Sequence, residues 1–480
     1  MARLKKPNLD SVTTINVDGS HFSPQPADVK GPFTSLRRWF GLILLVVYVA
    51  LPWIQINGYP ALFFDLAHRR FHLFGLTFLA QDLWLAFFVI AGLGLGLFYV
   101  TSLFGRLWCG WACPYTVFLE HIYRRIERWI DGDAAARRQL QKAPWTKSKV
   151  VKRVVKHSLF ILVALIIANV FLSYFVSLSS LYEYVKRPPL ENAKAFGVVM
   201  FLTLCLYFCF AWFREQFCII MCPYGRIQSA LTDENTMVIG YDGRRGEPRG
   251  KDRKGDNSEG GDCVSCQRCV QVCPTGIDIR NGLQMECIGC AACVDACDAI
   301  MHRLKRPKGL IRYDSLVGLN GGKTRYLRPR VMVYTVALVV GFLAMIYLLS
   351  GLHSVFADVN RMNGQPYYVT DEGVRNQYQI RLMTKLNQAT TFTIEVVDAP
   401  DGLVLSGFDQ SITLEAQSEA VRPFLAMISK DQYTGQFELK LSIRSTPGDD
   451  ELIKTVRFLG PSAYLLREKG VKEEGGKQTK

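Results

Sequence analysis

The sequence predicts a mixed fold: an α-helical membrane region with five transmembrane helices, an inserted cysteine-rich module and a C-terminal all-β, immunoglobulin-like sandwich. Three observations predict it. Five stretches of 18 to 22 residues are apolar and uncharged, which is the length a helix needs to cross a bilayer. All 14 cysteines lie between Cys109 and Cys297. Residues 351–480 show short alternating runs separated by turn residues.

The length and cysteine distribution exclude one broad class. At 480 residues the chain is expected to form two or three units. Its mean hydropathy of +0.11 is compatible with both membrane-embedded and water-exposed parts. Disulfide-stapled secreted proteins are short and do not confine their cysteines to one region, so that class is excluded.

The five candidate spans are joined by loops of unequal charge. The spans are Trp39–Ile56, Leu83–Phe104, Ser158–Leu178, Phe196–Phe213 and Val331–Ser350. The connection 105–157 holds twelve Lys and Arg residues, whereas 57–82 has two and 179–195 has three. The positive-inside rule therefore places the N-terminal tail 1–38, the connection 105–157 and the segment 214–330 in the cytoplasm. An odd number of spans then places residues 351–480 on the opposite side.

The charge balance follows this topology and argues against a nucleic-acid partner. The chain carries +15, yet residues 351–480 contain 15 Lys and Arg against 17 Asp and Glu. The whole basic excess thus lies in the first 350 residues, mainly in loops predicted to be cytoplasmic. Thirty-eight mostly polar residues precede the first span, which argues against a cleavable signal.

Two identical cysteine runs define the inserted module, residues 263–310. Residues 263–273 read CVSCQRCVQVC and residues 287–297 read CIGCAACVDAC. Both have the C-x₂-C-x₂-C-x₃-C spacing of bacterial-type 2[4Fe–4S] ferredoxins, in which the fourth cysteine ligates the other cluster. The spacing predicts two [4Fe–4S] clusters, one held by Cys263, Cys266, Cys269 and Cys297 and the other by Cys287, Cys290, Cys293 and Cys273. Zinc is the alternative, but eight cysteines exceed what one tetrahedral zinc needs.

Two features adjoin this module. Residues 241–262 are dense in Gly, Lys, Arg and Asp, a composition that predicts a flexible linker. Asp298 stands where the first motif has Pro274. Because that proline shapes a turn and is not a ligand, we expect a different local geometry after Cys297 with the ligands unchanged.

A second cysteine motif is repeated at the ends of two spans. Cys109 and Cys113 follow the second span and Cys218 and Cys222 follow the fourth, each pair reading C-x₃-C-P-Y. The repeat predicts two parallel copies within the membrane region, 39–240, whose cysteines meet at one cytoplasmic rim. Cysteines four apart share a helical face and can present two sulfurs to a soft ion such as Cu(I). Ordinary buried cysteines at a helix end are the alternative.

The surroundings of these two rim pairs carry further expectations. Arg106 and Arg214 are expected to lower the thiol pKa values and favour thiolates. Cys205 and Cys209, within the fourth span, have no counterpart in the second, which favours a structural role over a ligand role.

Histidines give little support for additional metal chemistry. His68 and His72 lie in the outer loop and could bind copper, although two histidines without a third ligand are more often incidental. No predicted span contains a histidine, which argues against a bis-histidine haem in the membrane.

The last 130 residues predict a domain with about seven short strands. The clearest runs are Gln379–Met383, Thr391–Val397, Ser411–Leu414, Gln436–Ile443 and Thr455–Phe458. Turn residues such as Pro400-Asp-Gly and Pro447-Gly-Asp separate them. This spacing favours an immunoglobulin-like sandwich with a structural or docking role, because no constellation of residues there looks catalytic.

Taken together, these motifs resemble the FixG/CcoG/RdxA family, the membrane polyferredoxins known as cytochrome c oxidase accessory proteins. The resemblance covers nearly the whole chain: both rim pairs, the dicluster module, the fifth span and the C-terminal sandwich. It implies a membrane-bound cupric reductase that converts Cu(II) to Cu(I) for assembly of cbb3-type cytochrome c oxidase. In such an enzyme the four rim cysteines, Cys109, Cys113, Cys218 and Cys222, would be the catalytic and copper-holding residues.

The resemblance also implies a cellular setting. It places the chain in the inner membrane of a Gram-negative bacterium, with the domain 351–480 in the periplasm. A cytosolic electron donor would supply the clusters, and a copper transporter or chaperone and oxidase assembly factors would be the partners. Two alternatives stay open: a quinone-linked electron carrier, and a non-enzymatic assembly scaffold whose C-terminal domain docks oxidase subunits.

Overall fold

The computed structural model describes residues 24–66, 69–79, 82–250, 260–351, 354–407, 411–448, 450–462 and 464. The chain divides into two compact units, Met1–Ile346 and Tyr347–Lys480. The predicted membrane region and ferredoxin module therefore belong to one unit, and the C-terminal sandwich forms the other.

Each of the five predicted spans contains a long helix, although the first helix ends at Ala50 instead of Ile56 and the third at Leu172 instead of Leu178. Among the described residues, five helices are long and apolar enough to cross a membrane: α1 (Pro32–Ala50), α2 (Trp84–Phe104), α7 (Lys147–Leu172), α9 with its π-helical continuation (Ala193–Phe213) and α15 (Pro329–Ser350). In α9 the α-helical part is Ala193–Tyr207 and the π-helical part, η3, is Phe208–Phe213. These helices indicate a membrane protein.

The first and third spans differ from their predicted boundaries. Helix α1 begins at Pro32 instead of Trp39, because proline suits the first helical turn and Asp295 accepts hydrogen bonds from the N–H groups of Phe33 (3.3 Å) and Thr34 (2.7 Å). Helix α7 begins at Lys147 instead of Ser158, because the side chain of Thr146 caps the N-terminus of the helix. The predicted tail 1–38 thus includes the first turns of α1.

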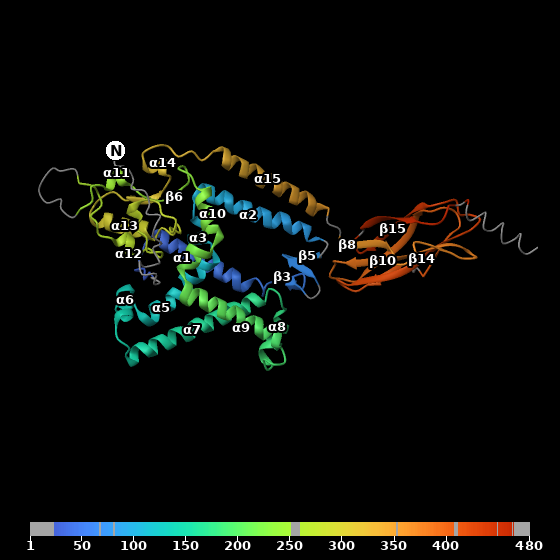
Figure 1. Cartoon of the computed structure of the whole chain (residues 1–480), viewed down its shortest axis with the longest axis horizontal. Helices are drawn as coiled ribbons and strands as arrows, with labels where there is room; N and C mark the ends of the chain where they lie inside the picture. The colour runs from blue at the N-terminus through green and yellow to red at the C-terminus, as the bar shows by residue number, and fades with distance from the viewer. Residues whose placement is uncertain are drawn as a thin grey trace, which may run out of the picture. The chain divides into compact units, whose positions relative to one another are not determined.

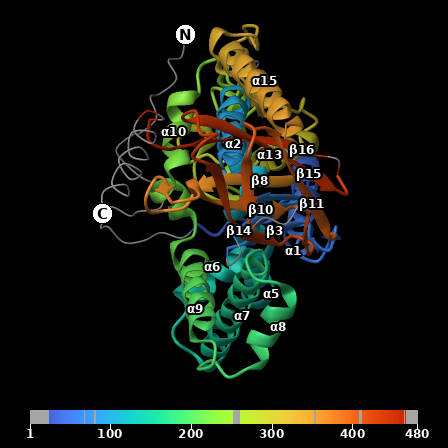
Figure 2. The same ribbon diagram turned by 90° about the vertical axis from the view of Figure 1, so that its right-hand side faces the viewer.

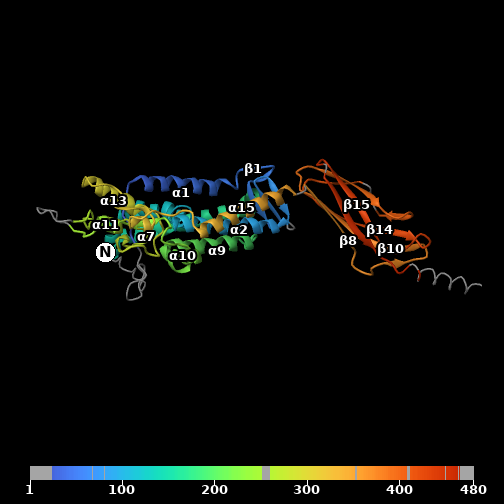
Figure 3. The ribbon, with the colours of Figure 1, turned by 90° about the horizontal axis from the view of Figure 1, so that it is seen from above.

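Short elements join the long helices. They are α3 (Leu107–Trp111), α4 (Pro114–Phe118), the π-helix η2 (Leu119–Tyr123), α5 (Arg124–Asp131), α6 (Ala134–Lys142), α8 (Leu178–Lys186), the π-helix η4 (Phe217–Met221) and α10 (Pro223–Leu231). Helices α7 and α9 pack along one another (Figures 1 and 2). The ferredoxin elements lie at one end of the long helices, and a small sheet lies at the other (Figures 1 and 3).

The small sheet forms from the loop between the first two spans. Its antiparallel strands are β3 (Leu62–Asp65), β4 (Arg70–Leu73) and β5 (Leu76–Leu79), beside a short pair formed by β1 (Gln55–Ile56) and β2 (Tyr59–Pro60). His72 is buried in β4, where its Nδ1 lies 3.0 Å from the Thr77 hydroxyl and its ring stacks on Tyr59 at 4.0 Å. The suggested partner His68 lies outside the described residues. In this structure His72 packs within the sheet.

The ferredoxin module contains short helices and one pair of strands, and its elements extend on both sides of the predicted range 263–310. Its elements are β6 (Val238–Tyr241), α11 (Gly243–Gly246), α12 (Arg268–Gln271), the 3-10 helix η5 (Ile279–Asn281), α13 (Ala292–Arg303), β7 (Ile311–Asp314) and α14 (Leu316–Leu319). Strands β6 and β7 pair antiparallel from Val238↔Asp314 to Tyr241↔Ile311. This pairing closes the module with residues from both of its ends.

The predicted linker is partly built into this module. Arg245 bonds to Asp262 (2.6 Å) and to the Lys308 carbonyl (2.9 Å), and Gly250 N–H donates to the Cys263 carbonyl (3.1 Å). The described ends of segment 241–262 are therefore folded against the cluster motifs, contrary to the expectation of a flexible linker. Residues 251–259 lie outside the described part.

The second unit is a two-sheet sandwich, as predicted. One sheet has the order β12 (Leu403–Ser406), β14 (Glu419–Ser429), β10 (Gly373–Thr384) and β8 (Val355–Arg361), with β9 (Tyr368–Val369) paired to β10. The other has the order β13 (Ser411–Leu414), β11 (Thr390–Asp398), β15 (Phe437–Thr446) and β16 (Glu451–Phe458). Alternate residues face a common core that includes Tyr378, Phe392, Phe424 and Leu441, as expected for packed sheets.

Candidate metal centre

The eight ferredoxin cysteines gather around two cavities. Cys263, Cys266, Cys269 and Cys297 line the first cavity. Cys273, Cys287, Cys290 and Cys293 line the second, and Cys269 also reaches its wall. The structure thus brings together the same two sets of four that the spacing predicts, with the fourth cysteine of each motif crossing to the other.

Matching left-handed residues shape the two motifs. Ser265 and Gln267 in the first motif have φ of 52° and 56°, and Gly289 and Ala291 in the second have φ of 66° and 59°. Left-handed conformations are uncommon for residues other than glycine, and they bend the chain sharply. Gln267 and Ala291 are the N-caps of α12 and α13. The chain therefore curls around each cavity and then enters a helix: α12 carries Cys269 and ends before Cys273, whereas α13 carries both Cys293 and Cys297.

The two motifs end differently, as the Asp298 substitution led us to expect. After Cys273, Pro274 follows the end of α12, whereas α13 continues through Cys297 and Asp298 to Arg303. Asp298 Oδ1 accepts a hydrogen bond from Gly309 N–H at 2.9 Å. Its carboxylate ties the helix to the following loop and leaves Cys297 facing the first cavity.

Both cavities fit an iron–sulfur cluster. Each offers four thiols in a largely buried, apolar setting, and backbone N–H groups of Gly289 and Ala292 donate to the sulfurs of Cys287 and Cys290. Burial raises the pKa of Cys287 and Cys297 to about 12, so binding to iron is what would deprotonate them. When bound, such clusters supply one-electron transfer.

The two rim pairs occupy equivalent backbone positions. The spans before them end at Gly105 (φ 55°, ψ −126°) and Arg214 (φ 50°, ψ −125°). Cys109 and Cys218 follow in α3 and η4, and each element is succeeded by a Cys-Pro step that starts α4 or α10. This matched geometry extends the sequence repeat to the backbone.

Two tyrosines form hydrogen bonds between the two copies of the repeat in the membrane region. The Tyr115 hydroxyl donates to the carbonyls of Cys209 (2.9 Å) and Arg214 (2.6 Å), at the end of the second copy's span. The equivalent Tyr224 hydroxyl lies 2.5 Å from that of Thr101, near the end of the first copy's span. Each copy therefore contacts the span of the other, which brings the two cysteine pairs to one place.

The four rim thiols influence one another electrostatically. Burial raises the pKa of Cys109 to about 11, and the neighbouring Cys113 and Cys222 add to this shift. Burial also raises the pKa of Cys218, followed by the effects of Cys113, Cys109 and Cys222. For Cys109 and Cys218 the expected net lowering of the pKa is therefore wrong, because desolvation outweighs the smaller lowering effect of Arg106 on Cys109.

The repeat also aligns these arginines differently from the expectation. Counted from the cysteines, Arg106 corresponds to Glu215 and Arg214 corresponds to Gly105. Arg106 donates to the Gly225 carbonyl, and Arg214 pairs with Glu127 at 2.6 Å. Arg106 thus connects the end of α2 to α10, and Arg214 connects the end of η3 to α5.

The rim pairs do not form a ready-made ion site. Within the described ranges, no three His, Cys, Asp or Glu side chains are grouped as a site for a single metal ion. Cys109 is contacted by Gln228, whose Nε2 lies 3.5 Å from its sulfur. The four predicted copper ligands therefore lie near one another without forming a coordination site. Their sulfur atoms would have to move closer together to bind one ion jointly.

The segment of the first rim pair packs directly on the backbone of the second cysteine motif. A Cβ atom on Gly110 would come within 2.5 Å of the Ile288 carbonyl oxygen and 3.0 Å of the Cys290 Cα. Trp111 Nε1 donates to the Gly289 carbonyl at 3.3 Å, and Cys109 packs on the hydrophobic cluster that contains Cys290. This contact joins the rim to the cluster motif without an intervening layer.

A buried charge network, which the sequence analysis missed, supports the second rim pair. Arg124 is fully buried and pairs with Glu120 and Glu215, and its Nη2 donates to the Pro274 carbonyl at 3.1 Å. Arg214 binds both oxygens of Glu127. The four-residue spacing of Glu120 and Arg124 is a signal that could have pointed to part of this network.

The remaining candidate cysteines stand apart. Cys205 is exposed on α9, and Cys209 is partly buried where η3 follows it. Neither lines a described cluster cavity. They are therefore not placed to ligate a cluster, and their structural role stays a prediction.

Comparisons with known families agree with this division of the chain. A family model described as a 4Fe-4S dicluster domain matches residues 213–316, and one described as a 4Fe-4S binding domain matches residues 85–132. A model of the Ig-like fold at the C-terminal end of FixG matches residues 345–461. The second match includes the first rim pair.

Curated relatives extend the likeness to most of the chain. Nitrogen fixation protein FixG of Rhizobium meliloti is 34% identical over 457 residues, covering 84% of this chain and 86% of its own. Protein RdxB of Cereibacter sphaeroides is 37% identical, covering 82% and 86%, and its RdxA is 36% identical, covering 79% and 82%.

A solved structure matches a smaller share of the chain. A FixG-related protein from Vibrio parahaemolyticus is 17% identical, covering 22% of this chain and 97% of its own, with a TM-score of 0.21. The full-length identities, together with the cluster motifs and five apolar helices, establish that this chain belongs to the FixG/RdxA family of membrane-associated 4Fe–4S electron-transfer proteins.

Proposed function

We propose that this protein reduces Cu(II) to Cu(I) at the rim pairs, with electrons from its iron–sulfur clusters, for the assembly of cbb3-type cytochrome c oxidase. Each Cu(II) ion takes up one electron and becomes Cu(I), which matches the one-electron chemistry of such clusters. A cytosolic reductant supplies those electrons.

The observation that carries the proposal is the contact of Gly110 with Cys290. Gly110 lies between Cys109 and Cys113, and its backbone touches the chain that carries a ligand of the second cluster. An electron leaving that cluster therefore reaches the first rim pair across a single layer of packed protein. The second pair, Cys218 and Cys222, is close enough to influence the same thiols.

The rim residues would then have distinct tasks. Thiol ligands favour Cu(I) over harder cations, so Cys109 and Cys113 would retain the reduced product. Gln228, which contacts Cys109, would orient that sulfur. The aromatic side chains of Trp111 and Tyr313, hydrogen-bonded at 3.2 Å, would fix the rim against the cluster motif.

Topology and partners complete this proposal. With the basic connections in the cytoplasm of a Gram-negative bacterium, the clusters and rim face the cytosolic donor and the sandwich lies in the periplasm. Cu(I) then passes to a copper transporter or chaperone, and oxidase assembly factors receive it from there.

The test compares cluster reoxidation in matched variants. The protein is purified without oxygen, its clusters are reduced, and Cu(II) is added while visible absorbance and Cu(I) are followed. Cys109→Ser with Cys113→Ser should keep the iron content and slow Cu(I) formation at least tenfold, whereas the exposed Cys205→Ser should change neither. Unchanged copper reduction would disprove the rim site. Loss of iron in the double variant would assign those cysteines to iron instead of copper.

A specific cavity favours a second candidate, a quinone-linked carrier. A space of about 240 Å³ beside the second cluster is lined largely by apolar side chains. Its lining includes Phe104, Arg106, Val238, Leu283, Met285 and Cys287. Because a cluster cysteine forms part of its wall, a planar acceptor bound there would exchange electrons directly. Fast reoxidation by a quinone analogue, lost in Met285→Trp with copper reduction intact, would favour this candidate.

A further inference from the structure

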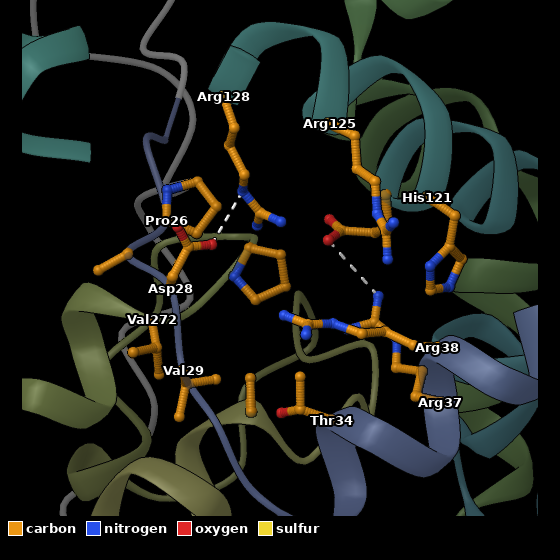
Figure 4. Close-up of a pocket in the computed structure, with 14 residues that line it drawn as sticks. Pro26, Asp28, Val29, Thr34, Arg37, Arg38, His121, Arg125, Arg128 and Val272 are labelled. Atoms are coloured by element: carbon orange, nitrogen blue, oxygen red, sulfur yellow. Dashed lines mark ion pairs between the residues drawn. The ribbon is translucent and has the colours of Figure 1, made fainter. Parts of the chain in front are cut away.

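A basic pocket lies where the start of α1 meets η2, α5 and the ferredoxin module. Four arginines line it, Arg37, Arg38, Arg125 and Arg128, together with His121. Figure 4 shows these side chains around one hollow, with Pro26, Asp28 and Val29 of the N-terminal segment on the opposite side. The enclosed space is about 50 Å³, which suits a small ligand group.

The acidic residues at this pocket already have basic partners. Asp28 pairs with Arg128 at 2.9 Å, and Glu120 pairs with the fully buried Arg124 outside the pocket. Within the described part of the chain, Arg38 and Arg125 make no ion pair. The pocket therefore holds more positive charge than its own carboxylates neutralise, which is the electrostatic condition for binding an anion.

One buried donor lacks a hydrogen bond here. Arg37 is 7% exposed, and its Nε donates to the Gly110 carbonyl at 2.8 Å, while its Nη2 is buried without a hydrogen bond among the described residues. The distance from Nη2 to the nearest carboxylate oxygen of Glu120 is 3.7 Å, an ion pair that one of the dashed lines in Figure 4 marks. Leaving a buried charged donor unbonded is costly, so a ligand acceptor at this point would relieve that cost.

The pocket includes residues at the start of a candidate membrane span, α1. Arg37 and Arg38 are in the opening turns of the apolar helix α1. Trp39 and Trp129, each next in sequence to an arginine of the pocket, are 66% and 78% exposed. Exposed tryptophans and arginines at the end of a span are typical of the membrane interface. Basic pockets between transmembrane helices are known recognition sites for anionic headgroups.

We propose that Arg37, Arg38 and Arg125 bind the phosphate of an anionic phospholipid headgroup, which fastens the ferredoxin module to the membrane surface. The phosphate oxygens accept from the guanidinium groups, and the acyl chains extend along α1. This assignment is independent of the copper proposal, because it uses no rim cysteine.

The site is also placed to affect the second cluster. Val272, Pro274 and Ala292 form part of the pocket wall, and each is adjacent in sequence to a cysteine of that cluster. An anion bound next to a redox centre disfavours addition of an electron. We therefore expect bound anionic lipid to lower the reduction potential of the second cluster.

The test uses the full-length protein in nanodiscs of phosphatidylcholine, with or without phosphatidylglycerol. Lipid retained after transfer to detergent is measured by mass spectrometry, and the cluster potentials are measured by redox titration. Arg38→Gln with Arg125→Gln should reduce phosphatidylglycerol binding about 30-fold, since each interfacial arginine contributes about one factor of five to six. It should also abolish the lipid-dependent shift in potential.

Matched controls make the outcome decisive. Arg226→Gln with Arg303→Gln removes two exposed arginines that do not line the pocket and should leave both readouts unchanged. Iron content and absorbance report that each variant is folded. Equal lipid retention in the two double variants would overturn the proposal. A further arm measures the binding of inorganic phosphate. If phosphate binds the wild-type protein as tightly as phosphatidylglycerol does, and if Arg38→Gln with Arg125→Gln weakens both to the same extent, the ligand is free phosphate and the lipid proposal is overturned.

Discussion

Gly110 lies so close to Cys290 that a single methyl group between them would meet the Cys290 backbone at 3.0 Å and the Ile288 carbonyl at 2.5 Å. The equivalent position in the second rim pair is Ile219. Glycine is thus found in the copy whose backbone rests on the cluster motif. Gly110 allows the two backbones to approach closely, which is a common reason for a glycine at such a position.

Gly110→Ala should therefore separate the first rim pair from the second cluster. The contact cannot be relieved by a side-chain movement, because the contacting atoms of Ile288 and Cys290 belong to the backbone. We expect cluster absorbance to be kept, while Cu(II)-dependent reoxidation slows by about tenfold or more, as misplacement of reacting groups generally causes.

Stopped-flow absorbance of the reduced protein measures this effect. Gly94→Ala is the matched control, because a Cβ at Gly94 on α2 meets nothing within 4 Å. Equal reoxidation rates for Gly110→Ala and Gly94→Ala would show that the rim contact does not carry the electrons.

The crossed ligand sets make a prediction about double variants. Cys297→Ser should remove the cluster of Cys263, Cys266 and Cys269, and with it half of the iron. Cys297→Ser with Cys266→Ser should lose no more iron than either single change, because both cysteines line the same cavity. Cys297→Ser with Cys290→Ser should lose nearly all of it.

Iron analysis and electron paramagnetic resonance of anaerobically purified protein distinguish these cases. Cys205→Ser, outside both cavities, should retain full iron. If each motif instead held its own cluster, the pair Cys297 and Cys290 would behave as one site and the pair Cys297 and Cys266 as two.

The sequence was sufficient to predict these cysteine sets because their spacing is a local property. The five spans were found for the same reason: length and uninterrupted apolarity can be read from consecutive residues. The start of α1 could not be found in this way, because its cap, Asp295, lies more than 260 residues away.

Tertiary burial explains the other differences. Arg106 and Arg214 near the rim cysteines seemed to favour thiolates, but the thiol pKa values depend more on desolvation, which the sequence does not reveal. Similarly, the Gly-rich segment 241–262 has the composition of a free linker. Contacts of Arg245 with Asp262 and Lys308 nevertheless fold its described ends onto the module.

The ion pair of Glu127 with Arg214 should make stability depend on pH. Burial alone would raise the pKa of Glu127, but the charge and hydrogen bonds of Arg214 lower it to about 2. Since the folded-state pKa is below the unfolded value of about 4.3, the pair stabilises the protein fully above pH 4.3. That contribution is lost as the pH falls towards 2.

Glu127→Gln should destabilise the folded protein by about 3 kcal/mol at pH 7, because it leaves the buried Arg214 with only the more distant Glu215 (3.8 Å) as a counter-charge. Thermal unfolding in detergent should show a constant difference from wild type between pH 8 and 5, which shrinks below pH 4.3. Glu183→Gln, which affects an exposed pair with Arg187 at 3.7 Å, should have almost no effect. A pH-independent loss would contradict the electrostatic explanation.

Asn376 should stabilise the C-terminal sandwich without affecting the clusters. Its buried side chain donates from Nδ2 to the Leu459 carbonyl (2.7 Å) and accepts through Oδ1 from the Leu459 N–H (3.1 Å). This pair of bonds ties strand β10 to the chain just after β16, in the other sheet. Asn376→Ala leaves backbone groups unpaired and should cost about 1–3 kcal/mol.

Limited proteolysis of the full chain measures this effect unit by unit. Asn376→Ala should speed cleavage within residues 354–462, while iron content and copper reduction stay at wild-type values, because all the cysteines belong to the other compact unit. Asn360→Ala is the matched control, since Asn360 is exposed and bonds only to Asp358 nearby (2.6 Å). If Asn376→Ala lowers iron content as well, the two units do not fold independently. If it impairs oxidase maturation while electron transfer is intact, the sandwich acts as the docking part of the protein.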